Sequence, residues 1–182
     1  MHYPGRFRQP GHSILPLGAH PHWEDDAKFG SRLINARSET VASKPSFRSA
    51  FKNRRCLIPT TGFFEWKREG DRKRPYLIGM RDGEPFAFAG IWERWTDPEG
   101  YIIETCAILT TSSNELVGEI HNRMPVILSP GDYNRWLAGD TALEPLADLH
   151  KPYPATLMIT REVTDLVNNP RCDAPECIQA VN

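Results

Sequence analysis

Cysteine is scarce in this sequence of 182 residues. The four thiols, Cys56, Cys106, Cys172 and Cys177, lack the paired CxxC spacing of a structural zinc site, so we expect no metal and no other cofactor. Cys172 and Cys177 lie close together in a segment with two prolines, and pairing or metal binding by them is an alternative. A reducing cytoplasm favours two free thiols.

Long apolar runs are also missing. None approaches the roughly 18 residues that a membrane-spanning helix requires, which excludes a membrane-spanning segment. Residues 1–9 carry no apolar run, and no secretory signal is visible. We therefore expect a cytoplasmic protein that has no membrane partner.

Net charge is nearly absent, because 22 Lys and Arg residues face 23 Asp and Glu residues. The charges are nevertheless spread unevenly along the chain. Residues 31–81 hold 13 basic and 4 acidic residues, a net charge of +9, and the rest holds 9 basic and 19 acidic residues, a net charge of −10. Such asymmetry is typical of a protein with an anionic partner, although a solvated basic surface without any partner explains it equally well.

The pattern of apolar residues predicts mostly short strands. The apolar runs near the middle of the chain are separated by short segments of hairpin-loop length. This spacing favours antiparallel pairing over parallel pairing, whose crossover connections need a dozen or more residues. With few helical signals, the chain is predicted to be an α+β protein with one largely antiparallel core and flanking helices. We expect a single domain over residues 1–182. The predicted strands are Arg55–Pro59, Pro75–Met80, Phe86–Trp92, Tyr101–Thr110, Met124–Leu128 and Thr156–Thr160.

Helices are predicted at four places. Pro45–Asn53 begins with proline and carries two phenylalanines four residues apart. Ser112 and Glu115 have the spacing of a capping box. Asp132 is placed to cap a helix that ends at Gly139, and a weaker signal covers Leu143–His150.

Three polar clusters are predicted where strand-forming runs end. Asn35 offers a hydrogen-bond donor and an acceptor, and the guanidinium of Arg37 offers paired N–H groups suited to binding phosphate. Glu65 lies among three aromatic residues, which would desolvate its carboxyl group and raise its pKa, as a general acid or base requires. His121 and Arg123 place an imidazole beside a guanidinium. Each cluster also has a structural interpretation: a turn cap at Asn35, an ion pair at Glu65 and a solvated loop histidine at His121.

An obvious nucleophile is lacking. The sequence contains no GxSxG elbow, no Walker phosphate loop and no HExxH motif. Lys67 and Lys73 can in principle form a Schiff base, but nothing singles them out. Trp23, Trp66 and Trp95 are candidates for stacking on unpaired bases, and filling the core is an equally good interpretation.

Taken together, the clusters resemble the SOS response-associated peptidase (SRAP) family, the abasic-site processing proteins. The resemblance runs from about Gly18 to the C-terminus, in family order and with family-like spacing. The matching stretches are Arg32–Thr40, Arg55–Trp66, Phe88–Trp92, Leu109–Thr111, Ile120–Pro125, Val167–Pro170 and Pro175–Ile178.

The resemblance implies a mixed, mainly antiparallel, barrel-like β core with flanking helices. It also implies that a monomer binds single-stranded DNA in a basic groove and crosslinks covalently to abasic sites in the DNA damage response, with an associated autopeptidase activity. In a bacterial source the protein would be associated with the nucleoid. By resemblance Asn35, Glu65 and His121 are catalytic, and the DNA-binding residues are Trp23, Arg37, Trp66 and Arg123.

Family members trap the aldehyde of an abasic site with an N-terminal cysteine, which removal of the initiator Met exposes. Here residue 2 is His2, no cysteine precedes Cys56, and the opening segment is shorter than in the family. We expect residues 1–17 to be divergent and poorly ordered. A misplaced start codon, a degraded gene or another nucleophile are the explanations left open. The alternative function is that of a non-catalytic single-stranded DNA-binding remnant.

Overall fold

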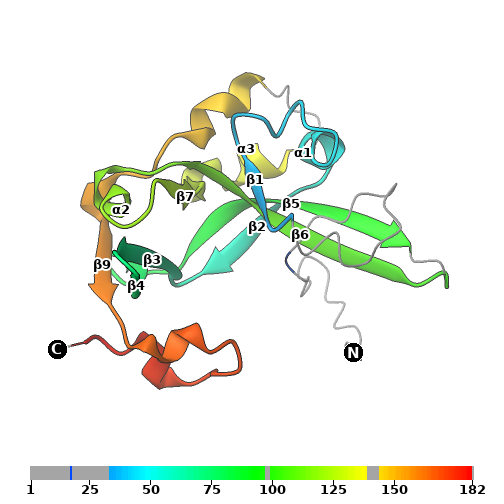
Figure 1. The fold of residues 1–182 in the computed structure, drawn as a ribbon. Coiled ribbons are helices and arrows are strands. Elements are labelled where there is room, and N and C mark those ends of the chain that lie inside the picture. Colours follow the sequence, from blue (N-terminus) through cyan, green and yellow to red (C-terminus); the bar gives the residue numbers. More distant parts are fainter. Residues whose placement is uncertain (1–16, 18–32, 97–98, 139–143, 182) are drawn as a thin grey trace.

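The computed structural model of the chain describes residues 17, 33–96, 99–138 and 144–181 (Figure 1). Over these residues the fold is α+β, with a curled, half-barrel β core flanked by a few short helices, so the predicted fold class is confirmed. The N-terminal segment predicted to be poorly ordered lies outside the described residues except for Leu17, and Trp23 lies outside them too.

The larger sheet has six strands and is built on its two longest, β5 and β6, which pair antiparallel. β2 lies on the far side of β5, and β1 joins β6 in the only parallel pairing between the strands of the described ranges. Two short strands, β7 and β8, continue the sheet beside β6 and β5. The bounds are β1 Asn35–Arg37, β2 Arg55–Thr60, β5 Phe86–Thr96, β6 Ile102–Ser112, β7 Arg123–Pro125 and β8 Ile127–Leu128.

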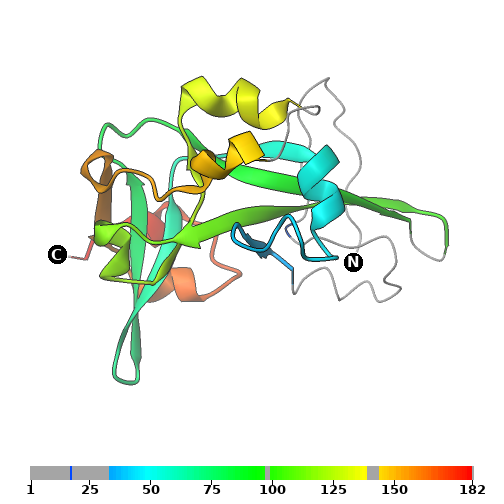
Figure 2. The same cartoon turned by 90° about the horizontal axis from the view of Figure 1, so that it is seen from above.

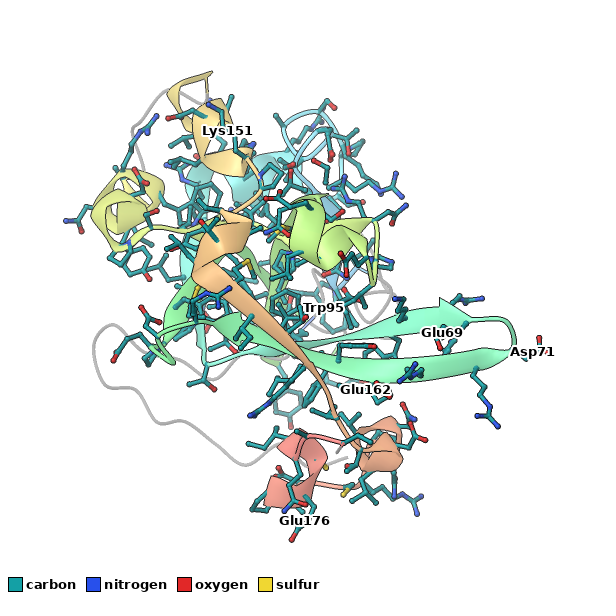
Figure 3. The ribbon with its side chains drawn as sticks, turned by 90° about the vertical axis from the view of Figure 1, so that its left-hand side faces the viewer. Glu69, Asp71, Trp95, Lys151, Glu162 and Glu176 are labelled. Carbon is teal, nitrogen blue, oxygen red and sulfur yellow. The ribbon has the colours of Figure 1, made fainter. Side chains whose placement is uncertain are left out.

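The smaller sheet has the antiparallel order β3 (Phe63–Glu69), β4 (Arg72–Met80) and β9 (Met158–Glu162). β3 and β4 form a long hairpin that projects from the body of the molecule, with Glu69 and Asp71 near its tip (Figures 2 and 3). The tip turns at Gly70, whose φ of 62° favours glycine. β3 was not predicted as a strand, because its aromatic and charged residues were interpreted as a cluster at a strand end.

The helices are short and surround the sheets. No helix among the described residues is long and apolar enough to cross a membrane. The predicted capping box at Ser112 is wrong: Ser112 is the last residue of β6, and the Asn114 side chain accepts a hydrogen bond from the backbone N–H of Val117 at 2.8 Å instead. The helices are α1 Arg48–Asn53, α2 Glu115–Gly118 and α3 Tyr133–Leu137, and 3-10 turns cover Pro130–Asp132, Glu144–His150, Ala155–Leu157, Asp165–Asn168 and Pro175–Ile178.

Two clusters of buried apolar side chains hold these layers together. One lies between the larger sheet and the helices, where Phe51 of α1 and Trp136 of α3 pack over Leu109 of β6. The other includes Phe88 of the larger sheet and Met158 of the smaller sheet. This second cluster fixes the smaller sheet against the larger one, and the position of Glu65 on β3 depends on it.

The residues after β9 form a C-terminal lobe (residues 163–181), which lies beside β9 in Figure 1. The chain leaves β9 and returns to it, because Val163 forms an antiparallel bridge with Ala180. The hydroxyl of Thr164 also donates to the carbonyl of Glu176 at 2.9 Å. The lobe is therefore a closed loop anchored on the smaller sheet.

Candidate active site

One face of the larger sheet carries polar side chains from three neighbouring strands. The parallel register of β1 and β6 places Arg37 beside Thr110, and the antiparallel register of β6 and β7 places Thr110 beside Pro125. Side chains of paired residues point to the same face of a sheet, and Asn35 shares this face because it is two residues from Arg37. Ala36, between them, points the other way into the core and is fully buried.

Glu65 reaches this face from the smaller sheet. One of its carboxylate oxygens lies 3.8 Å from Nδ1 of His121, and 25% of its side chain is exposed. Burial raises the pKa of Glu65 above its ordinary value, and the nearby His121 opposes this effect. A partly desolvated carboxyl group beside an imidazole is suited to proton transfer.

His121 is held by the backbone on both sides. The backbone N–H of His121 donates to the carbonyl of Val117, near the end of α2, at 2.9 Å. Its Nδ1 lies 3.2 Å from the backbone N–H of Arg123 and 3.1 Å from the carbonyl of the same residue. Nδ1 can thus accept in one tautomer and donate in the other, while the ring stays in place.

Arg123 closes the other side of the site. Its guanidinium is paired with the carboxylate of Glu39 and also donates to the carbonyl of Thr110 at 2.7 Å. Its Nε is buried without a hydrogen-bond partner within the described ranges. Arg37, by contrast, is exposed on the same face. The site therefore has one guanidinium that is held by an ion pair, that of Arg123, and one that is exposed, that of Arg37.

These side chains enclose a cavity of about 260 Å³. Thr110 also lines the cavity; it belongs to the family-like stretch Leu109–Thr111, but no role was predicted for it. Its hydroxyl lies 3.3 Å from the guanidinium of Arg123. The lining residues are Asn35, Arg37, Glu65, Thr110, His121, Arg123, Met124 and Pro125.

The structure does not bring every predicted site residue into this cavity. Trp66 follows Glu65 directly in β3, so its side chain lies on the opposite face of the strand. There its indole N–H donates to the side-chain oxygen of Asn168 at 2.7 Å. Trp23 lies outside the described residues. Trp95 is only 4% exposed and fills the core (Figure 3).

A larger hollow of about 730 Å³ lies between the β3–β4 hairpin and the C-terminal lobe. Arg74, one of its lining residues, is already paired with Glu69 at 3.0 Å and with Glu162. No group of three or more His, Cys, Asp or Glu side chains placed to hold a metal ion occurs in the part of the chain that the structure describes.

The fold and the smaller cavity define an α+β protein in which a carboxyl group and an imidazole share a cavity with two arginines. Comparison with known proteins agrees with this description and identifies the family. The sequence profile described as "SOS response associated peptidase (SRAP)" matches residues 8–170. The chain belongs to this family.

The chain is similar to proteins and structures of several bacteria. It is 44% identical over 168 residues to the abasic site processing protein YoqW of Bacillus subtilis, covering 91% of this chain and 75% of that protein. It is 32% identical over 170 residues to the abasic site processing protein YedK of Escherichia coli, covering 90% and 72%. The crystal structure of a protein from Bacteroides thetaiotaomicron superposes with a TM-score of 0.84 at 34% identity, over 91% of this chain and 75% of that one.

Proposed function

We propose that this chain processes abasic sites in single-stranded DNA, linking covalently to the aldehyde of the lesion, with Glu65 and His121 as the acid–base pair. The cavity in which these two residues meet Asn35, Arg37 and Arg123 carries the proposal. The names of the relatives YoqW and YedK support the substrate class. The net charge of +9 over residues 31–81, which include Arg37 and Glu65, supports a polyanionic partner.

The size of the cavity fits this substrate. About 260 Å³ is less than the roughly 300 Å³ at which pockets for drug-sized ligands begin. A sugar without its base is small enough for such a space, and it is smaller than an intact nucleotide by the whole base. The arginines at the rim would hold the phosphates on either side of the sugar, and Asn35 would orient its oxygen atoms.

The covalent step is the condensation of an amine with an aldehyde. A primary amine of the chain adds to the aldehyde carbon, and the oxygen of the addition product leaves as water to give an imine. Glu65 in its protonated form donates the proton that this oxygen needs, and burial favours that form. His121 takes the proton that the attacking amine gives up and passes it to Glu65, which restores the protonated carboxyl group. The same pair would also be able to donate a proton during attack on a peptide carbonyl, in keeping with a family described as peptidases.

The kind of linkage can be tested with a single-stranded oligonucleotide that carries one abasic site. A thiazolidine requires an amine and a thiol on one residue, whereas an imine requires an amine alone. For the proposed imine we expect an SDS-resistant adduct only after reduction with borohydride, which converts an imine to a stable amine. Undamaged oligonucleotide is the control. An adduct that survives SDS without reduction would contradict an imine, and absence of both adduct and binding would contradict a role on DNA.

The second candidate function is single-stranded DNA binding without a covalent step. It is favoured by one observation: Arg37 is exposed in the cavity, within a segment of net charge +9, which favours binding of a polyanion whether or not a covalent step follows. Binding with a steep salt dependence, together with no adduct even after borohydride, would support this second candidate.

A further inference from the structure

Two of the four cysteines meet in the C-terminal lobe. Sγ of Cys177 lies 3.2 Å from Sγ of Cys172, and the same sulfur lies 3.7 Å from the carbonyl oxygen of Cys172. A disulfide requires a sulfur–sulfur distance of about 2.05 Å, so a shift of roughly 1 Å would join the two atoms. Neither thiol belongs to the proposed active site.

Local hydrogen bonds hold both thiols in this arrangement. The backbone N–H of Cys172 donates to the carbonyl of Asn169 at 2.9 Å, and that of Cys177 donates to the carbonyl of Ala174 at 3.0 Å. Because the two cysteines are five residues apart within a lobe that is already closed on β9, their encounter needs little further ordering of the chain.

The other two cysteines are placed where they cannot pair. Cys56 of β2 is opposite Gly90 and Cys106 of β6 is opposite Trp92, so the whole of β5 lies between them. Two strand spacings separate their backbones by about 10 Å, beyond the roughly 7 Å limit for a disulfide. Burial also raises the pKa of Cys56 to about 12, which suppresses its thiolate.

We propose that Cys172 and Cys177 are a dithiol modification site that reacts with small-molecule disulfides and closes into an intramolecular disulfide. Cys172 reacts first, because it is half-buried whereas Cys177 is only 7% exposed. Its thiolate attacks the small disulfide and releases one small thiol, leaving a mixed disulfide on Cys172. Cys177 then attacks the Cys172 sulfur and releases the second small thiol. The protein loses two hydrogen atoms, and the small disulfide is reduced to two thiols.

The disulfide would stiffen the C-terminal lobe, which is joined to Trp66 by a hydrogen bond. Asn168, which accepts the hydrogen bond from the Trp66 indole, lies four residues before Cys172 in the same closed loop. The disulfide closes residues 172–177, and the hydrogen bond from the Cys172 N–H to the carbonyl of Asn169 links this ring to the segment that holds Asn168. The dithiol site itself does not depend on the proposed function.

The test is intact-mass spectrometry of the native 182-residue chain after incubation with oxidised glutathione. Hydrogen bonding by Cys177 raises the pKa of Cys172, and Asp173 and Glu176 add to this effect, so the reaction is run at alkaline pH. We expect wild-type protein to lose two hydrogen atoms and to retain no glutathione, with peptide mapping locating the link between residues 172 and 177.

Two variants separate the steps. Cys177→Ser is expected to retain one glutathione on Cys172, and Cys172→Ser is expected to stay unmodified while folded. Stable glutathione adducts on the wild type, no reaction at all, or a loss of two hydrogen atoms that persists in Cys172→Ser would each overturn the proposal. The peptide map of the wild type decides the matter even where a variant does not fold.

Discussion

Arg123 forms a bidentate ion pair with Glu39, in which Nη2 donates to Oε2 at 2.9 Å and Nη1 pairs with Oε1. These hydrogen bonds lower the pKa of Glu39 to about 2, so the pair persists at any physiological pH. Because Nη2 also donates to the carbonyl of Thr110, most of the guanidinium fork is occupied. In the proposed function, a DNA phosphate would therefore have to compete with Glu39 for Arg123.

Removing this competitor should strengthen DNA binding and weaken the chemistry. In Glu39→Gln we expect tighter binding to single-stranded DNA, with the slope of log affinity against log salt concentration steeper by about 0.7. The rate of adduct formation should fall, because Arg123 is no longer held beside Thr110. Fluorescence anisotropy and borohydride trapping measure the two quantities. Glu84→Gln removes the same charge from an exposed loop outside the cavity and serves as the control. Weaker binding by Glu39→Gln would show that Glu39 only maintains the fold.

Glu65 should reduce the stability of the folded protein at neutral pH. Its pKa is raised by burial, so the folded state favours the protonated form, and stability is lost as the pH rises from the ordinary value of 4.5 through the folded-state pKa. Glu65→Gln resembles the protonated form at every pH. We expect this variant to be more stable than wild type at pH 8 and equal to it at pH 4, by urea denaturation. A constant difference at both pH values would contradict the raised pKa.

Much of the fold could be predicted because its strands are apolar and its turns contain Gly or Pro. Phe86–Trp92 and Tyr101–Thr110 correspond to β5 and β6, although both strands differ from the predicted ranges at their ends. β3 was missed because charged residues interrupt its aromatic ones, as Glu65 does between Phe64 and Trp66, so this edge strand contains no apolar run.

The assembly of the site was harder to predict than its members. Asn35, Glu65 and His121 stood out by residue type, but their distances depend on the packing of the smaller sheet against the larger one. Thr110 joins them only through the parallel pairing of β1 with β6, which links residues far apart in the sequence. Trp66 was grouped with Glu65 by adjacency, whereas adjacent residues of a strand face opposite ways.

His150 should make the protein sensitive to mild acid. Its ring packs against Phe51 and Trp136 at centroid distances of 5.7 and 6.3 Å, and its Nε2 is buried without a hydrogen-bond partner in the described part of the chain. Burial lowers its pKa below 6.5, while Asp148 and Glu39 oppose the shift. Stability is therefore complete above pH 6.5 and falls as the pH drops from there through the folded-state pKa. His150→Phe should flatten this part of the stability profile, measured by urea denaturation between pH 5 and 8. An unchanged profile would contradict this assignment.

Arg55 should be among the most important side chains for stability. It is 7% exposed, and its guanidinium donates to four backbone carbonyls, those of Phe51 and Lys52 in α1 and those of Trp136 and Ala138 at the end of α3. Arg55→Met removes two buried and two partly buried hydrogen bonds and should lower the free energy of unfolding by about 3 to 5 kcal/mol. The control, Arg48→Met on the exposed side of α1, should change it by no more than about 0.5 kcal/mol. Similar losses in both variants would show that the network around Arg55 contributes little.

The central claim is that Glu65 transfers a proton during adduct formation at an abasic site. The most direct measurement is the rate of borohydride trapping by Glu65→Gln at saturating abasic single-stranded DNA, beside Glu69→Gln, which removes the same charge from the exposed end of the same strand. We predict that Glu65→Gln traps at least about 100-fold more slowly than wild type with unchanged DNA affinity, while Glu69→Gln traps at the wild-type rate. Equal trapping rates for the two variants would contradict the claim.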